Sequence, residues 1–396
     1  MLVLSPLSAQ NSARPPDLLV PYTESAPALQ SRAAVVLDAA TGTVLYAKNP
    51  DEEIPPASLT KLMTIHIALE EAAAGRISLD EKINPPRDSW AVNQPPRSSL
   101  MFLAAGQEVS LREILLGLAV SSGNDAAVAT ALIISPSVKD FAFLMNREAQ
   151  RLGLLKTRFV EPSGISEYNM TTADEYARFC RTYIAKHPET ITGLHSVPEF
   201  AYPKAENVAE AFRDDPRTIV QYNRNKLLKT FPGVDGLKTG YIDEAGYNIA
   251  LTAERENTRF IAVILGAPAA PGGEAIRDAD GRKLLTWAFD TFKTVRPVIG
   301  DIANARLWKG REKFAELKAG GSSEFTAPAA RGSSLTISTV LNDPLIAPLP
   351  ADFPAGNLVI SDEEGELHRI PLLTVREYVK GNVFKRFWDS IRLLFH

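Results

Sequence analysis

The chain has 396 residues, of which 45% are hydrophobic and 23% charged, and its formal net charge is −4. A chain of this length can bury a large core and is expected to form two domains. The absence of a basic excess argues against a nucleic-acid partner, and the single cysteine, Cys180, excludes an internal disulfide and a multi-cysteine zinc site.

Residues 1–30 are rich in proline, serine and alanine and show no periodicity, which predicts an N-terminal tail. The first ten residues are apolar and end in small residues, as the end of a secretory signal does, but they lack a positively charged start. We therefore expect either a tail or a signal-peptide remnant. No run of 18 apolar residues occurs, so the sequence predicts no membrane-spanning helix.

The structured part begins with a predicted hairpin, whose strands cover residues 34–37 and 43–47. A helix then begins near Ser58, because apolar residues recur after it at helical spacing, at Leu62, Ile65, Leu69 and Ala72. Periodicity predicts three further helices, over residues 111–120, 126–134 and 173–185.

Strands dominate the next part of the chain. One strand is expected to end in Lys238-Thr239-Gly240, and two adjacent strands cover residues 247–253 and 259–265 before a closing helix at 281–292. When strands flank a long helical middle, helices usually lie on an antiparallel sheet. We therefore predict an α+β catalytic domain over residues 31–296.

Short strand-like runs between glycine, proline, serine and asparagine clusters predict a small all-β domain over residues 297–371. Residues 372–396 are predicted to form an amphipathic C-terminal helix. Its apolar face collects Val383, Phe384, Phe387, Trp388, Ile391, Leu394 and Phe395. Such a helix is too short to span a bilayer but suits the interface of an anionic membrane. The alternative is a terminal helix that docks on the β domain.

Three ordered motifs carry the chemistry. They are Ser58-Leu59-Thr60-Lys61, Ser122-Gly123-Asn124 and Lys238-Thr239-Gly240. A serine hydroxyl needs a base within hydrogen-bond reach to act as a nucleophile. Lys61 follows Ser58 by one helical turn and can be that base, and a nearby Lys238 would lower the pKa of its amine.

The same motifs can bind a reacting carbonyl group. Ser58 at a helix N-terminus has free backbone N–H groups that suit an oxyanion, and a second donor would follow Gly240. A glycine at position 240 would let a substrate peptide approach the strand edge closely. The five histidines include no pair at metal-binding helical spacing, so we expect no metal ion.

Together with the flanking runs 34–38, 234–237, 245–248 and 283–287, these motifs resemble the low-molecular-mass penicillin-binding proteins, the D-alanyl-D-alanine carboxypeptidases of peptidase family S11. The resemblance extends from about residue 31 to the C-terminus. It implies a serine β-lactamase/transpeptidase-like fold and a reaction that needs no cofactor. It further implies removal of the terminal D-alanine from peptidoglycan stem peptides, covalent inhibition by β-lactam antibiotics, and a periplasmic or other extracytoplasmic location at the outer face of the cytoplasmic membrane.

By this resemblance Ser58 is the nucleophile, Lys61 its base, and Ser122 and Asn124 relay protons and contact the substrate. Lys238 and Thr239 would hold the substrate carboxylate beside Gly240. Alignment back from residues 282–285 also assigns Arg277 to the carboxylate, although an insert at residues 267–273 precedes it. Tyr241 departs from the family pattern, in which histidine is frequent.

Three alternatives stay open. A serine β-lactamase of the same fold needs a further general base, and the region after the middle motif offers Glu161 and Glu167 without the Glu-x-x-Leu-Asn arrangement of class A enzymes. Deacylation of penicillin should therefore be slow. A D,D-endopeptidase that acts on cross-links, and a catalytically inactive cell-wall-binding protein, are the other two.

Overall fold

A computed structural model of the chain describes residues 26–395. Most of the predicted N-terminal tail, residues 1–30, therefore lies outside the described residues. The chain divides into two compact units, of which the first ends at Ala288 and the second begins at Phe289.

The first unit is built on a five-stranded antiparallel sheet with the strand order β2-β1-β9-β8-β7. These strands are β1 (Ala33–Asp38), β2 (Val44–Lys48), β7 (Val234–Ile242), β8 (Gly246–Arg255) and β9 (Thr258–Ala267). The predicted hairpin and the two adjacent strands are confirmed. Lys238-Thr239-Gly240 lies within β7 and not at its end, because β7 pairs with β8 as far as Ile242. β7 is an edge strand of this sheet.

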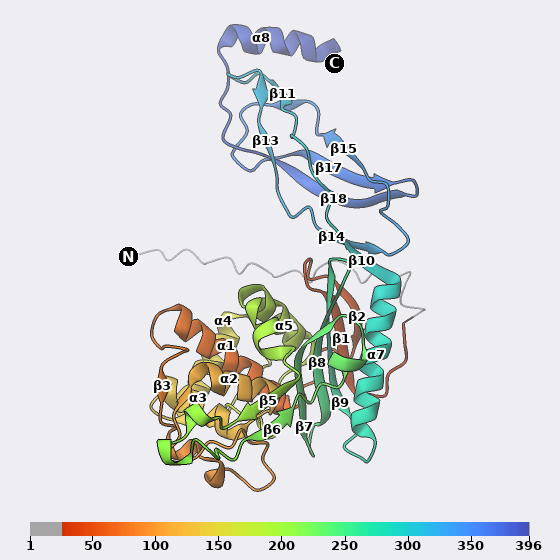
Figure 1. Ribbon diagram of the computed structural model, residues 1–396. Coiled ribbons are helices and arrows are strands. Elements are labelled where there is room, and N and C mark those ends of the chain that lie inside the picture. The colour runs from red at the N-terminus through yellow and green to blue at the C-terminus, as the bar shows by residue number, and fades with distance from the viewer. Residues whose placement is uncertain (1–25, 396) are drawn as a thin grey trace, which may run out of the picture. The chain divides into compact units, whose positions relative to one another are not determined.

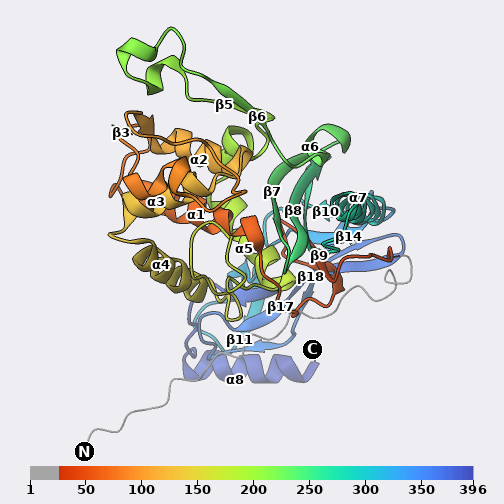
Figure 2. The same cartoon turned by 90° about the horizontal axis from the view of Figure 1, so that it is seen from below.

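Helices cover both faces of the sheet (Figures 1 and 2). One face carries α1 (Thr60–Ala73), α2 (Leu111–Val120), α3 (Asn124–Ile134), α4 (Val138–Arg151) and α5 (Ala173–Lys186), and the other carries α7 (Gly273–Thr291). All four helices predicted in the middle of this unit are present, whereas α4 was not predicted. The closing helix begins earlier than the predicted residue 281. Shorter elements are β3 (Lys82–Ile83), β4 (Val109–Ser110), β5 (Glu199–Tyr202), β6 (Ile219–Tyr222) and α6 (Leu227–Thr230).

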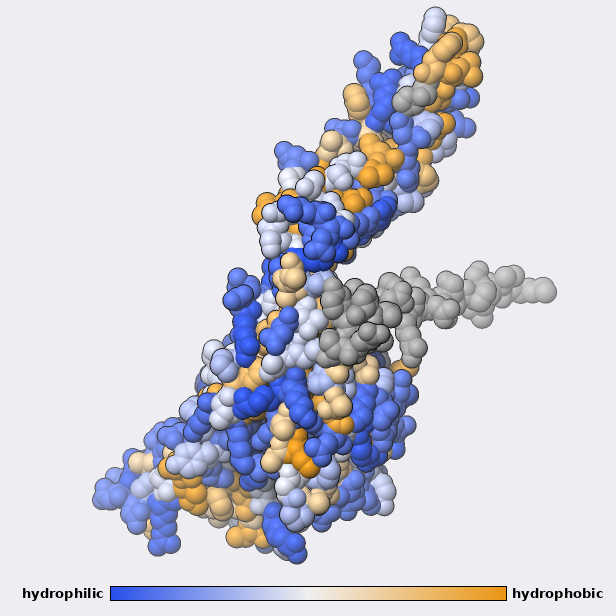
Figure 3. Space-filling view, turned by 90° about the vertical axis from the view of Figure 1, so that its right-hand side faces the viewer, coloured by the Kyte–Doolittle hydropathy of each residue, from blue (hydrophilic) through white to orange (hydrophobic). Residues whose placement is uncertain are grey.

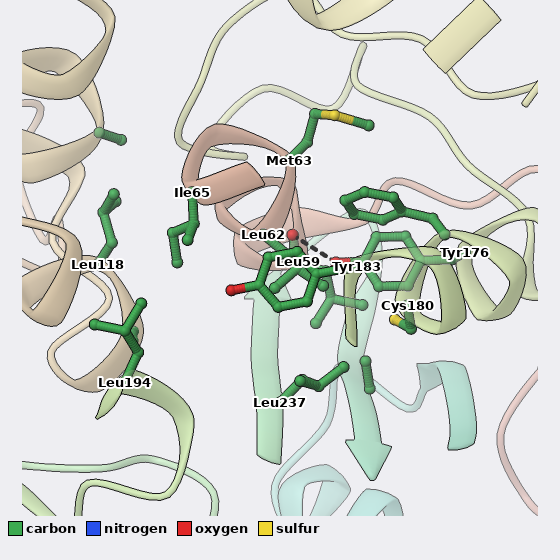
Figure 4. Packing of buried hydrophobic residues seen from close by; sticks show 14 of the residues in the cluster. Leu59, Leu62, Met63, Ile65, Leu118, Tyr176, Cys180, Tyr183, Leu194 and Leu237 are labelled. Carbon is green, nitrogen blue, oxygen red and sulfur yellow. Dashed lines mark hydrogen bonds between the residues drawn. The ribbon is translucent and has the colours of Figure 1, made fainter. Parts of the chain in front are cut away.

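The core of the first unit fixes the start of α1. Leu59, Leu62 and Ile65 are fully buried and pack among side chains from α2, α5 and β7 (Figure 4). The hydroxyl of the buried Tyr176 donates a hydrogen bond to the carbonyl of Leu59 at 2.7 Å. A hydrogen bond and dense packing therefore hold the first turn of α1 in place.

The second unit is a small all-β domain, as predicted. Its main sheet has the order β13-β18-β17-β15, and two smaller sheets are β10-β14 and β12-β11-β16. The strands are β10 (Phe292–Val295), β11 (Ala305–Trp308), β12 (Phe314–Ala315), β13 (Leu317–Ala319), β14 (Phe325–Pro328), β15 (Thr336–Leu341), β16 (Leu345–Ile346), β17 (Pro354–Asp362) and β18 (Gly365–Thr374). This unit begins before the expected residue 297, because β10 pairs with β14 and so belongs to it.

The C-terminal helix α8 (Val383–Arg392) is shorter than the predicted segment 372–396. β18 extends to Thr374, and Tyr378 is fully buried in the core of the second unit. The β domain therefore continues to about residue 380. The side chain of Asn382 caps α8 by accepting a hydrogen bond from the backbone N–H of Lys385 at 2.9 Å.

α8 contacts the β domain through polar groups. Asp389 is buried and its Oδ2 accepts a hydrogen bond from the backbone N–H of Lys309 at 2.7 Å. Lys385 Nζ donates to the carbonyl of Glu312 at 2.7 Å and to that of Gly310. The exposed side of the helix is apolar, and hydrophobic side chains gather there (Figure 3). Its exposed members, with the turn that follows the helix, are Val383, Phe384, Phe387, Trp388, Leu394 and Phe395.

Within residues 26–395, no single helix is both long and apolar enough to cross a membrane. The consecutive helices α3 and α4 are long and apolar enough to cross a membrane only when they are counted together, and they meet at an angle of 85°. Both helices contribute to the core cluster of the first unit.

Candidate active site

The three sequence motifs meet at the start of α1. Ser58 lies in a 3-10 turn, Ala57–Leu59, directly before this helix. Lys61 Nζ is 3.0 Å from Ser58 Oγ and donates a hydrogen bond to Asn124 Oδ1 at 2.8 Å. Lys238 Nζ, from β7, donates to Ser122 Oγ at 3.0 Å. The structure thus brings two hydroxyls, two amines and an amide to one place, from α1, α3, β7 and the turns that precede the two helices.

Burial sets the protonation of Lys61. This side chain is 0% exposed, and desolvation lowers the pKa of its amine to about 7, although Glu161 and Asp125 partly oppose the shift. Burial also lowers the pKa of Lys238, and the positive charge of Lys61 lowers it further. A substantial fraction of Lys61 is therefore neutral near pH 7, and a neutral amine 3.0 Å from a hydroxyl can accept its proton.

We expect the acylation rate to increase as the pH rises through about 7. Below this pH the Lys61 amine is protonated and cannot accept the serine proton, and above it the neutral form dominates. The measurement is the second-order rate constant for labelling by a fluorescent penicillin across the neutral range. A neutral thioester substrate, which does not need a positive Lys238, is the control. A flat profile with both reagents would contradict the role of Lys61.

Asp125, in the first turn of α3, holds residues 101–103 against this helix. Its carboxylate accepts hydrogen bonds from the backbone N–H groups of Met101, Phe102 and Leu103, at 2.7 to 3.0 Å. Ser122 has φ 59°, a left-handed conformation that is unusual for a residue with a side chain. Such a conformation persists only where the surroundings enforce it, and here it directs Ser122 towards Lys238.

A loop that the motifs do not predict completes the surroundings of Lys61. The carbonyl of Ser163 accepts a hydrogen bond from Lys61 Nζ at 2.5 Å. Glu161 folds this loop, since its carboxylate accepts from the backbone N–H groups of Ser163 and Gly164, both at 2.7 Å. Gly164 has φ +80°, and a Cβ there would lie 1.8 Å from the carbonyl oxygen of Ala57. Only glycine allows this loop to pack against the serine-bearing turn.

The arrangement of Glu161 bears on the β-lactamase alternative. Both of its carboxylate oxygens are already hydrogen-bonded within its own loop, one of them also to Asn169 Nδ2 at 2.8 Å. Glu167 is exposed. Neither carboxylate has the free and directed position that a deacylating base requires.

Gly240 is explained by the packing of the chain itself. A Cβ at this position would lie 2.8 Å from the carbonyl oxygen of Pro56 and 3.0 Å from the backbone nitrogen of Ser58. The sequence suggested a different reason, the close approach of a substrate. Asn248, which faces Gly240 across the β7–β8 pair, donates to the carbonyl of Pro55 at 2.9 Å and is a further positioning residue that the motifs did not indicate.

Arg277 lies in the second turn of α7 and is 3% exposed. Its guanidinium donates to Asp278 Oδ1 at 2.6 and 2.9 Å. Its positive charge contributes to the lowered pKa of Lys238. The charge of Arg224, a residue that no motif indicated, contributes in the same direction. Arg277 therefore lies within electrostatic range of Lys238, but its hydrogen bonds are to its own helix.

The fold and the site define a serine-type hydrolase. The family model described as D-alanyl-D-alanine carboxypeptidase, peptidase family S11, matches residues 21–269. The chain is 34% identical to the D-alanyl-D-alanine carboxypeptidase DacC of Escherichia coli strain K12 over 381 residues, which are 94% of this chain and 90% of DacC.

Solved structures agree with this match. Penicillin-binding protein 5 from Haemophilus influenzae superposes with a TM-score of 0.76 and 30% identity, over 89% of this chain and 99% of that one. Penicillin-binding protein D2 from Listeria monocytogenes, in its ampicillin-bound form, superposes with a TM-score of 0.56 and 30% identity, over 66% of this chain and 98% of that one. The chain therefore belongs to the D-alanyl-D-alanine carboxypeptidase family, S11, and the predicted family and α+β fold class are confirmed.

Proposed function

We propose that this protein is a serine D,D-carboxypeptidase that removes the terminal D-alanine from peptidoglycan stem peptides. The observation that carries this proposal is the buried Lys61 amine 3.0 Å from Ser58 Oγ in a chain of this family. Ser58 Oγ attacks the carbonyl carbon of the penultimate D-alanine while its proton passes to Lys61. The peptide bond then breaks, and the leaving D-alanine takes a proton by way of Ser122. Water hydrolyses the resulting ester and restores the serine.

Substrate orientation follows from the charges around the site. Lys238 and Thr239, with Gly240 and Arg277 beside them, would bind the terminal carboxylate. The negative charge of that carboxylate would favour the protonated form of Lys238, whose pKa is lowered by burial in the free site. The backbone N–H groups of Ser58 and of the residue after Gly240 would donate hydrogen bonds to the oxyanion.

Release of D-alanine tests the proposal. The purified chain is incubated with a pentapeptide that ends in D-Ala-D-Ala, and free D-alanine is measured. A peptide that ends in D-Ala-L-Ala is the matched control and should stay intact. Cleavage of a cross-linked peptide dimer into monomers, without release of D-alanine from the pentapeptide, would instead support an endopeptidase. Covalent labelling by fluorescent penicillin without any peptide hydrolysis would refute a carboxypeptidase.

Reaction with β-lactams is part of the same proposal. A β-lactam carbonyl would acylate Ser58, and the acyl-enzyme would be long-lived because both oxygens of Glu161 are engaged in its own loop. Failure to label the native protein at all would favour the inactive wall-binding alternative.

Arg277→Ala should reduce kcat/KM for peptides with a free terminal carboxylate by roughly 10- to 100-fold, the range expected for a lost charged hydrogen bond. Acylation by a neutral thioester should change much less. Arg282→Ala, an exposed arginine of the same helix, is the matched control. Equal losses on both substrates would show that Arg277 acts through packing.

We further propose that α8 attaches the enzyme to an anionic membrane surface on the extracytoplasmic side. The support is its orientation, because the polar residues Lys385 and Asp389 contact the β domain while the apolar face is exposed. A helix that only served packing would bury its apolar face. Exposed aromatic residues beside Arg386 and Arg392 suit the membrane interface.

A chain truncated after Lys380 should lose sedimentation with anionic liposomes and keep its activity on small peptides. Truncation after Pro371, the predicted end of the β domain, would instead cut β18 and remove the buried Tyr378. The doubly substituted full-length chain Phe387→Ser, Trp388→Ser retains the polar contacts and should also lose binding. If the native chain, the chain truncated after Lys380 and the double variant all partition identically with liposomes, α8 is not a membrane anchor.

A further inference from the structure

A second group of ionisable side chains lies away from the reacting serine, where three helices of the first unit meet. His66 and Glu70 are one turn apart on α1, Glu148 is on α4, and His187 directly follows α5. Both imidazoles are buried, and the two carboxylates are partly exposed. The acyl-transfer mechanism uses none of them.

Three of the four side chains lie close enough together to share a metal ion. His66 Nδ1 is 3.0 Å from His187 Nε2, and His187 Nε2 is 3.4 Å from Glu70 Oε1. One ligand atom from each of these three residues lies within 4.8 Å of the other two. Two ligands of a tetrahedral zinc ion, with bonds of 2.0–2.1 Å, lie about 3.3 Å apart. The distances of 3.0 and 3.4 Å are close to this spacing, and the third pair of ligand atoms lies within 4.8 Å.

The fourth residue orients the set. Glu148 Oε1 is 2.8 Å from His66 Nε2, so this ring nitrogen carries the proton and Nδ1 presents its lone pair to the cluster. A carboxylate that holds the far nitrogen of a ligating histidine is the usual support of protein zinc sites. Arg151 in turn binds both oxygens of Glu148, at 2.6 and 2.7 Å, and fixes it.

We propose that His66 Nδ1, His187 Nε2 and Glu70 Oε1 form a Zn²⁺ site, in which Glu148 is the positioning residue of His66. A water molecule would complete the tetrahedron, and the partly exposed Glu70 provides the route from solvent. The ion would replace the hydrogen bond between the two imidazoles. Because His66 Nε2 carries the His66 proton, the hydrogen in that bond belongs to His187 Nε2, and on ion binding it would move by exchange with solvent to Nδ1 of the same ring. The ion would then link α1 to the end of α5. Since α1 also carries Lys61, the site would brace the catalytic helix without touching substrate. Sequence spacing missed it because His66 and His187 are 121 positions apart.

The test is Zn²⁺ binding by full-length protein freed of metal with a chelator. Calorimetry and elemental analysis after desalting should give one ion per chain, and Tm should rise with Zn²⁺ concentration. Glu70→Gln and His187→Gln should remove high-affinity binding and this rise in Tm. Glu148→Gln should weaken affinity by about 10- to 100-fold, as expected for the loss of a supporting carboxylate.

Matched controls separate this site from adventitious binding. Glu71→Gln changes the neighbouring residue, which pairs with Arg76, and His368→Gln changes a partly exposed histidine of the second unit; both should bind as the native chain does. Labelling by fluorescent penicillin reports whether each variant is folded. The proposal fails if the native chain binds no Zn²⁺, or if Glu70→Gln and His187→Gln bind it as tightly as the native chain. The histidines would then form only a buried hydrogen-bonded pair.

Discussion

Replacement of Ser58 by alanine is expected to abolish covalent penicillin labelling and to lower D-alanine release by roughly a millionfold, as removal of the nucleophile does in other serine hydrolases. The hydroxyl is the only group lost, and the packing of Leu59 and Leu62 that holds this turn does not involve it. The variant should therefore unfold at nearly the native temperature. Gel fluorescence after labelling and a thermal melt measure the two effects.

Ser121→Ala is the matched control for this variant. Ser121 is buried next to Ser122, and its hydroxyl donates to the carbonyl of Gly117 within α2. Loss of this hydroxyl removes a hydrogen bond close to the site but no reacting atom, so labelling should persist. Persistent labelling of Ser58→Ala would assign the nucleophile to another residue.

Lys61→Met is expected to slow acylation by about 10²- to 10⁴-fold, the usual contribution of a general base. Methionine fills a similar buried volume without a proton acceptor. The change also leaves Asn124 Oδ1 and the carbonyl of Ser163 without the donor that they now have, so some loss of stability should accompany it. Stopped-flow labelling and urea unfolding separate the two effects.

Lys61→Arg distinguishes loss of the base from loss of the hydrogen bonds. A guanidinium can still donate to these oxygens, but it stays protonated at any accessible pH. It should therefore acylate as slowly as the methionine variant and show no rise in rate near pH 7. Native-like acylation by either variant would assign proton transfer to a different group.

Periodicity predicted most of the first unit because its helices and central strands have strong apolar patterns. α4 was not predicted, although Phe141, Met145 and Ala149 recur at four-residue spacing. The apolar stripe that they form is narrow and is surrounded by polar residues. β18 was missed because its first half is largely exposed and carries polar residues. The end of the β domain was also misplaced, since Tyr378 is buried while the residues on both sides of it are exposed and show no apolar periodicity.

The candidate site was predictable where short motifs define it and not elsewhere. Ser58, Lys61 and Lys238 lie in recognisable motifs and were brought together by the fold. The Ser163 carbonyl could not be predicted, since a backbone oxygen leaves no mark in the sequence. Glu161 was noticed as a carboxylate, but only the folded loop shows that it binds its own backbone.

The outer edge of β7 has a consequence for self-association. A free strand edge is a template on which another chain can pair and aggregate. Here the carbonyl of Gly236 accepts from Asn225 Nδ2 at 3.2 Å, and that of Leu237 is 3.1 Å from His195 Nδ1. Burial lowers the pKa of His195 to about 3, so its ring stays neutral and this contact persists at physiological pH. A foreign strand therefore finds the beginning of β7 already occupied, which protects the enzyme against edge-to-edge aggregation.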